Sequence, residues 1–255
     1  MRRQNPRDLE GHRETPIIWT SQWSEISIGA MTEFPVLYSF RRCPYAMRAR
    51  MALASSGQLV ELREILLRDK PADMINASPK ATVPVLVMDD ATVLEESLDI
   101  MLWALDRNDP DQWLKPEAGN IDDMLGLISF MDGEFKHHLD NYKYASRKAG
   151  PEDDIETFAH HHRQKGLDIL NSLEHSLQSR GFLFGDRISL ADVAIAPFVR
   201  QFANTDADWF GQQSCPNLQS WLTGFLESQL FLSVMEKRKP WQPGDAICTF
   251  PRLAA

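Results

Sequence analysis

The stretch SFRRCPYAMRAR, residues 39–50, places a cysteine directly before a proline, between an apolar run and a segment with helical spacing. Proline suits the first turn of a helix, because its missing N–H has no partner there and its fixed φ matches the helix. Cys43 is therefore predicted to cap a helix over residues 44–56. At such a position the free N–H groups and the positive end of the helix stabilise a thiolate, and Arg41 and Arg42 add positive charge. We expect the pKa of Cys43 to fall below the ~8.5 of a free cysteine.

The chain has three cysteines, Cys43, Cys215 and Cys248, and their spacing does not suit a metal site. An odd number of thiols in a chain of 255 residues indicates free cysteines in a reducing compartment, which predicts a cytoplasmic location. Position 46, where a dithiol redox protein carries its second cysteine, is Ala46. An external thiol must then resolve any disulfide formed by Cys43, and glutathione is the abundant cytosolic candidate.

Composition and charge exclude several classes of partner. The formal net charge is −9, so phosphate backbones and anionic lipid surfaces should repel the protein, and we predict no nucleic-acid partner. The N-terminal residues 1–13 are too polar for a signal peptide, and no apolar run approaches the ~20 residues of a membrane span. We predict that the protein does not associate with a membrane.

The chain divides into two regions with different hydrophobic patterns. Short apolar runs alternate with helical patterns over residues 34–107, which predicts a small α/β domain. The Pro- and Asp-rich residues 108–118 indicate a linker. Residues 119–255 show helical spacing and end in a tail, so they are predicted to form an all-α domain. Residues 1–33 form an N-terminal extension.

Several motifs at fixed spacings resemble one family. The sequence carries Cys43-Pro44-Tyr45-Ala46, then Val83-Pro84 and Glu96-Ser97, with Lys70 between the first two. Lys70, Val83, Glu96 and Ser97 follow Cys43 by 27, 40, 53 and 54 residues. This set is similar to the glutaredoxin-like half of cytosolic glutathione transferases, above all the cysteine-type omega-like class, and the likeness extends over roughly residues 34–235. The resemblance implies a thioredoxin-like α/β domain followed by an all-helical domain.

The resemblance also implies a glutathione site. The Val83-Pro84 bond is expected to be cis, leaving the backbone of Val83 free to pair with the cysteinyl part of glutathione. Glu96 and Ser97 stand at the start of a helix, where they would receive the γ-glutamyl ammonium and carboxylate. Lys70 would reach the glycyl carboxylate. Taken singly, Ser97 is equally an ordinary N-cap, and Glu96 and Lys70 are equally surface charges.

The helical half offers weaker signals. Ser189 and Asp192 fit a capping box, so Asp192 is interpreted as a folding residue. The histidine runs 137–138 and 160–162 are not expected to bind a metal, because neighbours on one helix point about 100° apart. Tyr45, Phe135 and Tyr142 could line a cleft for a second substrate, although aromatic residues spaced along a helix are more often core.

The reaction that these residues favour is thiol–disulfide exchange through a Cys43–glutathione mixed disulfide. The substrate would be a small disulfide or another oxidised or electrophilic compound, as in deglutathionylation or reduction of dehydroascorbate. Two alternatives remain: conjugation of glutathione to electrophiles, with Tyr38 and Ser39 as nearby hydroxyls, and a scaffold that binds glutathione without turnover. The resemblance leaves a homodimer open.

Overall fold

The computed structural model describes residues 34–252, so the predicted extension 1–33 lies outside the described part of the chain. The first half contains the strands and helices that the sequence predicts. β1 (Val36–Ser39) leads into α1 (Pro44–Ser56), followed by β2 (Val60–Glu64), α2 (Ala72–Ala77), β3 (Val85–Val87), β4 (Val93–Leu94) and α3 (Ser97–Arg107). The prediction of a mixed α/β domain is confirmed.

Helix α1 begins and ends at residues whose backbone preferences require it. Cys43 is its N-cap, with extended backbone angles of φ −73° and ψ 123°, and Pro44 occupies the first helical position. Gly57 ends the helix in the left-handed region at φ 68°, where a side chain would be strained. The predicted range of residues 44–56 is therefore confirmed.

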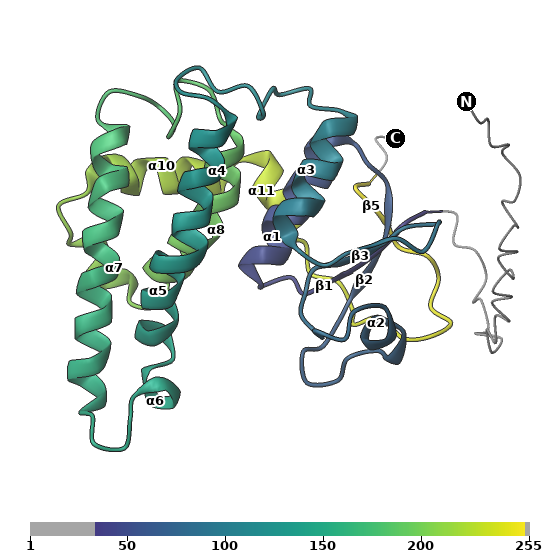
Figure 1. The fold of residues 1–255 in the computed structure, drawn as a ribbon, viewed down its shortest axis with the longest axis horizontal. Coiled ribbons are helices and arrows are strands. Elements are labelled where there is room, and N and C mark those ends of the chain that lie inside the picture. Colours follow the sequence, from purple (N-terminus) through teal and green to yellow (C-terminus); the bar gives the residue numbers. More distant parts are fainter. Residues whose placement is uncertain (1–33, 253–255) are drawn as a thin grey trace, which may run out of the picture. The chain divides into compact units, whose positions relative to one another are not determined.

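The sheet has five strands in the order β4-β3-β1-β2-β5. β1 and β2 are parallel, and the remaining pairs are antiparallel. Because side chains alternate along a strand, Leu37 packs into the core on the face covered by α1, while Val36 and Tyr38 join a smaller cluster with Met74 of α2. Figure 1 shows α1 and α3 between the sheet and the helices of the second half.

The second half is helical as predicted. Its elements are α4 (Ile121–Phe130), the π-helical turn η1 (Met131–Phe135), α5 (Lys136–Lys143), α6 (Ala145–Lys148), α7 (Ile155–Leu177), α8 (Leu190–Ala203), α9 (Ala207–Gly211), α10 (Pro216–Glu227) and α11 (Gln229–Val234). The two halves share one apolar core, which runs from Leu37 and Met47 to Phe198 and Trp221. Within residues 34–252, every helix is too short or too polar to cross a bilayer.

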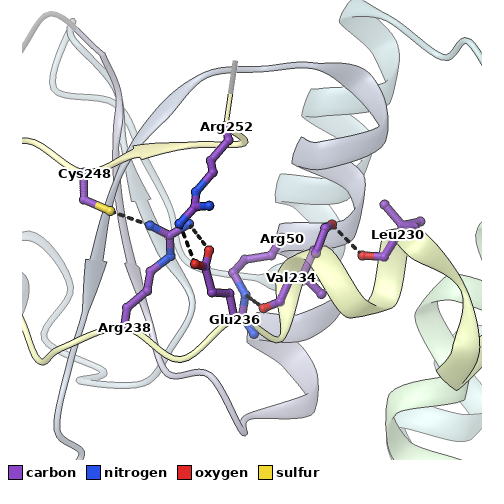
Figure 2. Close-up of polar contacts among 8 residues, drawn as sticks. Arg50, Leu230, Val234, Glu236, Arg238, Cys248 and Arg252 are labelled. Atoms are coloured by element: carbon purple, nitrogen blue, oxygen red, sulfur yellow. Dashed lines mark hydrogen bonds and ion pairs between the residues drawn. The ribbon is translucent and has the colours of Figure 1, made fainter. Parts of the chain in front are cut away.

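The C-terminal tail returns to the sheet, a contact that the sequence prediction of a helical half with a tail did not include. β5 (Thr249–Phe250) pairs antiparallel with β2, and Leu62 N–H donates to Cys248 O at 2.8 Å. Figure 2 shows how side chains fix this tail: Arg238 contacts Glu236 and Cys248, and Arg252 contacts Glu236. The tail therefore covers the edge that β2 would otherwise expose.

Candidate active site

Cys43 lies at the turn between β1 and α1, where the sequence predicted it. Its N–H donates to Phe40 O at 3.0 Å, and its carbonyl accepts the first helical bond from Met47 N–H at 2.9 Å. The thiol is partly exposed, and its Sγ lies 3.6 Å from Val83 O. The turn therefore presents the thiol directly beside the Val83-Pro84 segment.

The expected low pKa of this thiol is wrong for the protein without a ligand. Burial raises the pKa of Cys43 above its ordinary value, although the N–H groups of Ala46 and Tyr45 and the charges of Arg50 and Lys136 act to lower it. The loss of hydration outweighs the helix terminus. Arg41 and Arg42 are not the cations that act most on the thiol, since Arg50 and Lys136 take that part. The Arg42 guanidinium lies over the Phe40 ring, 5.5 Å from its centre.

Arg50 is a buried cation behind this turn, and the sequence analysis did not single it out. It is 2% exposed, and burial lowers its pKa to about 10. Its guanidinium donates to Ser39 Oγ, to Arg41 O at 2.9 Å and to Val234 O at 3.2 Å. The bond to Val234, shown in Figure 2, ties the turn to the end of α11.

The Val83-Pro84 peptide bond is cis, as predicted. None of the hydrogen bonds described within residues 34–252 uses the N–H of Val83, so this group is available to an external acceptor. Its carbonyl faces the Cys43 thiol. A ligand chain lying along Val83 would therefore place its own atoms next to Sγ.

A pocket of about 360 Å³, which we call the Ser97 pocket, opens beside this segment. It brings together Val83, Pro84, Glu96 and Ser97 from the predicted glutathione set, and also Tyr45. Ser97 starts α3, and Glu96 is its N-cap. The full lining is Tyr45, Arg48, Lys80, Thr82, Val83, Pro84, Glu95, Glu96, Ser97 and Asp132.

Arg48 and Asp132 both line this pocket and pair with each other, and sequence reasoning missed both. Arg48 Nε donates to Ser97 Oγ at 2.9 Å, while its Nη1 and Nη2 donate to the two Asp132 carboxylate oxygens at 2.9 and 2.7 Å. The guanidinium also lies 5.0 Å from the Tyr45 ring centre and 5.3 Å from that of Phe198. The available signal was an arginine among the small and apolar residues of α1, where a charge needs a buried partner.

Lys70 does not line the Ser97 pocket, so the structure does not join it to the rest of the predicted set. Lys80 does line it, and pairs with the Glu96 carboxylate. Both side chains of this pair are well exposed, 48% and 64%, so the pair is open to exchange with a charged ligand. The role of Lys70 toward the glycyl carboxylate stays a prediction.

A larger pocket of about 700 Å³, which we call the basic pocket, is lined in part by residues 40 and 42 of the Cys43 turn. Its lining is Phe40, Arg42, Leu66, Leu67, Arg68, Lys143, Tyr144, Arg200, Gln201 and Asn204. Phe135 and Tyr142 line neither this pocket nor the Ser97 pocket. They are 0% and 8% exposed and belong to the core, so the alternative given for them above is the one observed.

The two histidine runs meet, which reasoning from a single helix could not show. His137, His138 and His162 offer ring nitrogens that lie within 4.8 Å of one another. The Nδ1 atoms of His138 and His162 are 2.8 Å apart, the distance of a hydrogen bond between neutral rings. Burial and the neighbouring imidazoles lower the pKa of His162 to about 4. This hydrogen bond accounts for the closest pair without a metal ion.

Asp192 has the folding role that its pattern predicted. Its Oδ2 accepts from Ser189 N–H at 2.9 Å and Oγ at 2.6 Å, which completes the capping box of α8. Its Oδ1 accepts from Leu183 N–H and Trp221 Nε1, both at 2.9 Å. The carboxylate is fully buried and lines neither the Ser97 pocket nor the basic pocket.

Comparison with known proteins gives the same assignment for both halves. Residues 37–113 match the glutathione S-transferase N-terminal domain family, and residues 145–224 match the glutathione S-transferase C-terminal domain family. A maleylacetoacetate isomerase of Rattus norvegicus is 30% identical over 180 residues, which cover 68% of this chain and 78% of that protein. The probable glutathione S-transferase parA of Nicotiana tabacum is 26% identical over 202 residues, covering 76% and 86%.

Solved structures share the fold. A glutathione transferase family member of Pseudomonas fluorescens, crystallised with two glutathione molecules bound, superposes with a TM-score of 0.70 at 19% identity, covering 82% of this chain and 95% of that one. The transferase URE2P6 of Phanerochaete chrysosporium, in complex with oxidized glutathione, has a TM-score of 0.67 at 18% identity, covering 78% and 94%. With both domain families matched and a relative at 30% identity, the chain belongs to the glutathione S-transferase family.

Proposed function

We propose that the protein is a glutathione-dependent thiol transferase that works through a mixed disulfide between Cys43 and glutathione. The observation that carries the proposal is the position of the thiol, partly exposed at the N-terminus of α1 and 3.6 Å from the carbonyl of the cis Val83-Pro84 segment. Position 46 is alanine, and Cys43 is a free thiol in the structure, so an outside thiol has to complete the cycle.

The Ser97 pocket supplies groups that suit a glutathione zwitterion. Ser97 Oγ and the N-terminus of α3 offer hydrogen bonds to the γ-glutamyl carboxylate, and Glu96 and Asp132 offer negative charge to its ammonium. Val83 N–H and carbonyl offer a backbone pair to the cysteinyl residue. Relatives and neighbours that are named for glutathione support this placement.

The proposed cycle balances without another cofactor. The Cys43 thiolate attacks the glutathionyl sulfur of a disulfide GS–SR, the S–S bond breaks, and RS⁻ leaves and takes up a proton. A second glutathione thiolate attacks the mixed disulfide, which releases glutathione disulfide and restores the Cys43 thiolate. Glutathione is thereby oxidised and the substrate disulfide reduced. We propose that the enzyme belongs to the cysteine-type omega-like transferases and that it acts in the cytoplasm. Either a monomer or a homodimer is compatible with this proposal.

Conjugation is the second candidate, and one observation favours it. Because burial raises the pKa of Cys43, the side chain of the unliganded protein carries an S–H group that could donate a hydrogen bond to a glutathione thiolate. In that reaction Cys43 would stabilise the attacking thiolate and would form no covalent bond. A scaffold role, with binding and no turnover, is the third.

One set of measurements separates these functions. The protein is treated with glutathione disulfide, and adducts are located by peptide mass mapping; thiol transfer and conjugation of a model electrophile are then assayed in wild type and in Cys43→Ser, with Cys215→Ser and Cys248→Ser as matched controls. Thiol transfer predicts one glutathionyl group on Cys43, removable by reduced glutathione, and loss of transfer by orders of magnitude in Cys43→Ser. Conjugation predicts no adduct and turnover of the electrophile. Glutathione binding with neither result would indicate the scaffold.

A further inference from the structure

The basic pocket adjoins the Cys43 turn, although Cys43 itself lines neither this pocket nor the Ser97 pocket. Arg42 is the neighbour of Cys43 in the chain, and Cys43 N–H bonds to Phe40 O, so two lining residues belong to the catalytic turn. Tyr144 also lines the pocket, and its pKa is raised first by burial and then by Asp140, with Cys43 acting in the same direction. At about 700 Å³, the pocket has the size of a small-molecule site.

The charge in this pocket is of one sign. Its lining includes four cations, Arg42, Arg68, Lys143 and Arg200, and no carboxylate. In the described part of the chain, none of the four side chains forms an ion pair, and none donates a hydrogen bond to a protein acceptor. The net charge of the whole chain is −9, so this concentration of positive charge is local.

Neighbouring groups leave this charge largely uncompensated. The pKa of Lys143 is lowered first by burial and then by Arg200, and Arg42 acts in the same direction. Asp140 acts in the opposite direction on Lys143, but its carboxylate is paired with Lys136. The pKa of Arg200 is lowered by burial and by Arg41. Cations that repel one another in a partly buried pocket favour an anionic ligand.

Glutathione alone does not account for four cations. In the arrangement proposed above, its γ-glutamyl end occupies the Ser97 pocket, where Glu95, Glu96 and Asp132 balance Arg48 and Lys80. Its glycyl carboxylate, for which Lys70 is the predicted partner, is a single charge and would occupy at most one or two of the cations of the basic pocket. The remaining cations of the lining have no counter-charge among the described side chains and are available to a second anionic ligand.

We propose that the basic pocket binds the second substrate and that this substrate is a small compound bearing at least two carboxylate groups. The inference rests on the proposed thiol transfer. In that reaction, the substrate is a disulfide GS–SR whose R group carries the carboxylates. Its glutathionyl half lies in the Ser97 pocket, and R lies against Lys143 and Arg200, with the apolar walls of Phe40 and Leu66 covering its carbon atoms.

The cations would act on the leaving group as well as on binding. When the Cys43 thiolate attacks the glutathionyl sulfur, the electron pair of the S–S bond passes to the sulfur of R, which leaves as a thiolate and takes up a proton. A multiply charged anion is then present beside Arg42 and Lys143, and positive charge at that place stabilises it.

The test uses three disulfides of glutathione that differ in the charge of R: mercaptosuccinate with two carboxylates, mercaptoethanol with none, and cysteamine with an ammonium. The measured quantity is kcat/KM for release of RSH, divided by the uncatalysed rate with glutathione. We expect a preference of at least about tenfold for mercaptosuccinate over mercaptoethanol, the weakest turnover for cysteamine, and a preference that shrinks as salt is added. Equal values for the three disulfides in wild type would overturn the proposal.

Variants then assign the preference to the pocket. Arg200→Gln and Lys143→Gln should each lower the ratio of mercaptosuccinate to mercaptoethanol turnover about tenfold. Lys165→Gln removes an exposed cation of α7 that does not line the pocket, and should leave the ratio unchanged. A loss of the same size for all three disulfides in the pocket variants contradicts a role in recognising the substrate anion. Glutathione disulfide is assayed beside these compounds, and fast turnover of glutathione disulfide without a preference for mercaptosuccinate would show recognition of a second glutathione and overturn the proposal.

Binding of unreactive thioethers tests the pocket even if no disulfide is turned over. Calorimetry with Cys43→Ser compares S-(1,2-dicarboxyethyl)glutathione with S-(2-hydroxyethyl)glutathione, and tighter binding of the first supports the proposal whatever the reaction is. Equal affinities overturn it. S-methylglutathione isolates the glycyl carboxylate: if Arg200→Gln weakens its binding as much as that of the dicarboxyethyl compound, the cation serves glutathione and the proposed second-substrate site is wrong.

Discussion

Replacement of Arg48 tests whether the two halves are joined at the Ser97 pocket as the structure indicates. Its guanidinium uses one edge for Ser97 on α3 and the other for Asp132 in η1, so one side chain of α1 connects both halves. Arg48→Met keeps much of the apolar stem that packs on Tyr45 and Phe198 and removes all three hydrogen bonds. We expect this variant to lose both stability and glutathione affinity, because Ser97 Oγ is left without its donor.

The expected loss in the free energy of unfolding follows from the different exposure of the Arg48 and Asp132 side chains. Breaking a buried ion pair by removing one partner costs about 3–5 kcal/mol. The side chains of Arg48 and Asp132 are 3% and 26% exposed, so water can solvate the carboxylate that Arg48→Met leaves behind. We expect a loss near 3 kcal/mol for Arg48→Met and nearer 5 kcal/mol for Asp132→Ala, which strands the buried guanidinium. The double variant should lose at least about 2 kcal/mol less than the sum, because neither charge is then left alone.

The assay is urea unfolding, followed by the fluorescence of the tryptophans and by circular dichroism, with glutathione titrated into each folded variant. Lys80→Met is the control, because its pair with Glu96 is exposed and should contribute under about 1 kcal/mol. Losses in the Arg48 and Asp132 variants no larger than in this control would refute the buried pair. Additive losses in the double variant, or a larger loss for Arg48→Met than for Asp132→Ala, would refute the argument from exposure.

Three further results are expected. Asp192→Ala should lower the free energy of unfolding by about 4 kcal/mol, because N–H groups of Leu183, Ser189 and Trp221 lose a buried acceptor. Trp221→Phe removes one of these donors and should lower it by about 1 kcal/mol. Equal losses of the two variants in urea unfolding would contradict the network. Because burial raises the pKa of Cys43, its rate of alkylation by iodoacetamide should reach half-maximum at a higher pH than that of cysteine in a short peptide, and a lower midpoint would show that the helix terminus dominates. Burial, together with His138, His161 and His137, lowers the pKa of His162 to about 4, so this side chain binds a proton more readily in the unfolded chain. The free energy of unfolding in urea should therefore fall as the pH drops from about 6.5 toward 4, and it should fall less steeply in His162→Gln. Parallel pH profiles of wild type and variant would exclude His162 as the cause.

The features predicted correctly depend on residues close together in the chain. The Cys43-Pro44 pair fixed the start of α1, and Gly57 lies at its end, because both act through local backbone geometry. The capping box of α8 was found for the same reason. The cis bond at Val83 came from the family resemblance, since a proline by itself indicates only that the residue before it is extended.

The features that were missed depend on residues that only folding brings together. Asp132 is 84 residues from Arg48, so the chain alone does not indicate which carboxylate a buried arginine finds. His162 comes to His138 from another helix, and a rule about neighbours on one helix could not foresee it. The predicted direction of the pKa shift of Cys43 was wrong, because the sequence shows the nearby charges but not the burial that outweighs them.

Two sources of positive charge flank the Cys43 turn, and they differ in what a substrate can do to them. The cations of the basic pocket face open space, so an anionic substrate would neutralise them as it binds. Within residues 34–252, the hydrogen bonds of Arg50 go only to neutral oxygens, those of Ser39, Phe40, Arg41 and Val234. Its guanidinium is buried and does not line the basic pocket. Arg50 would therefore keep its effect on the Cys43 thiolate while the substrate is bound, when ionisation of the thiol is needed. Since the end of α11 helps to hold Arg50, a residue more than 180 positions along the chain contributes to the charge at the thiol.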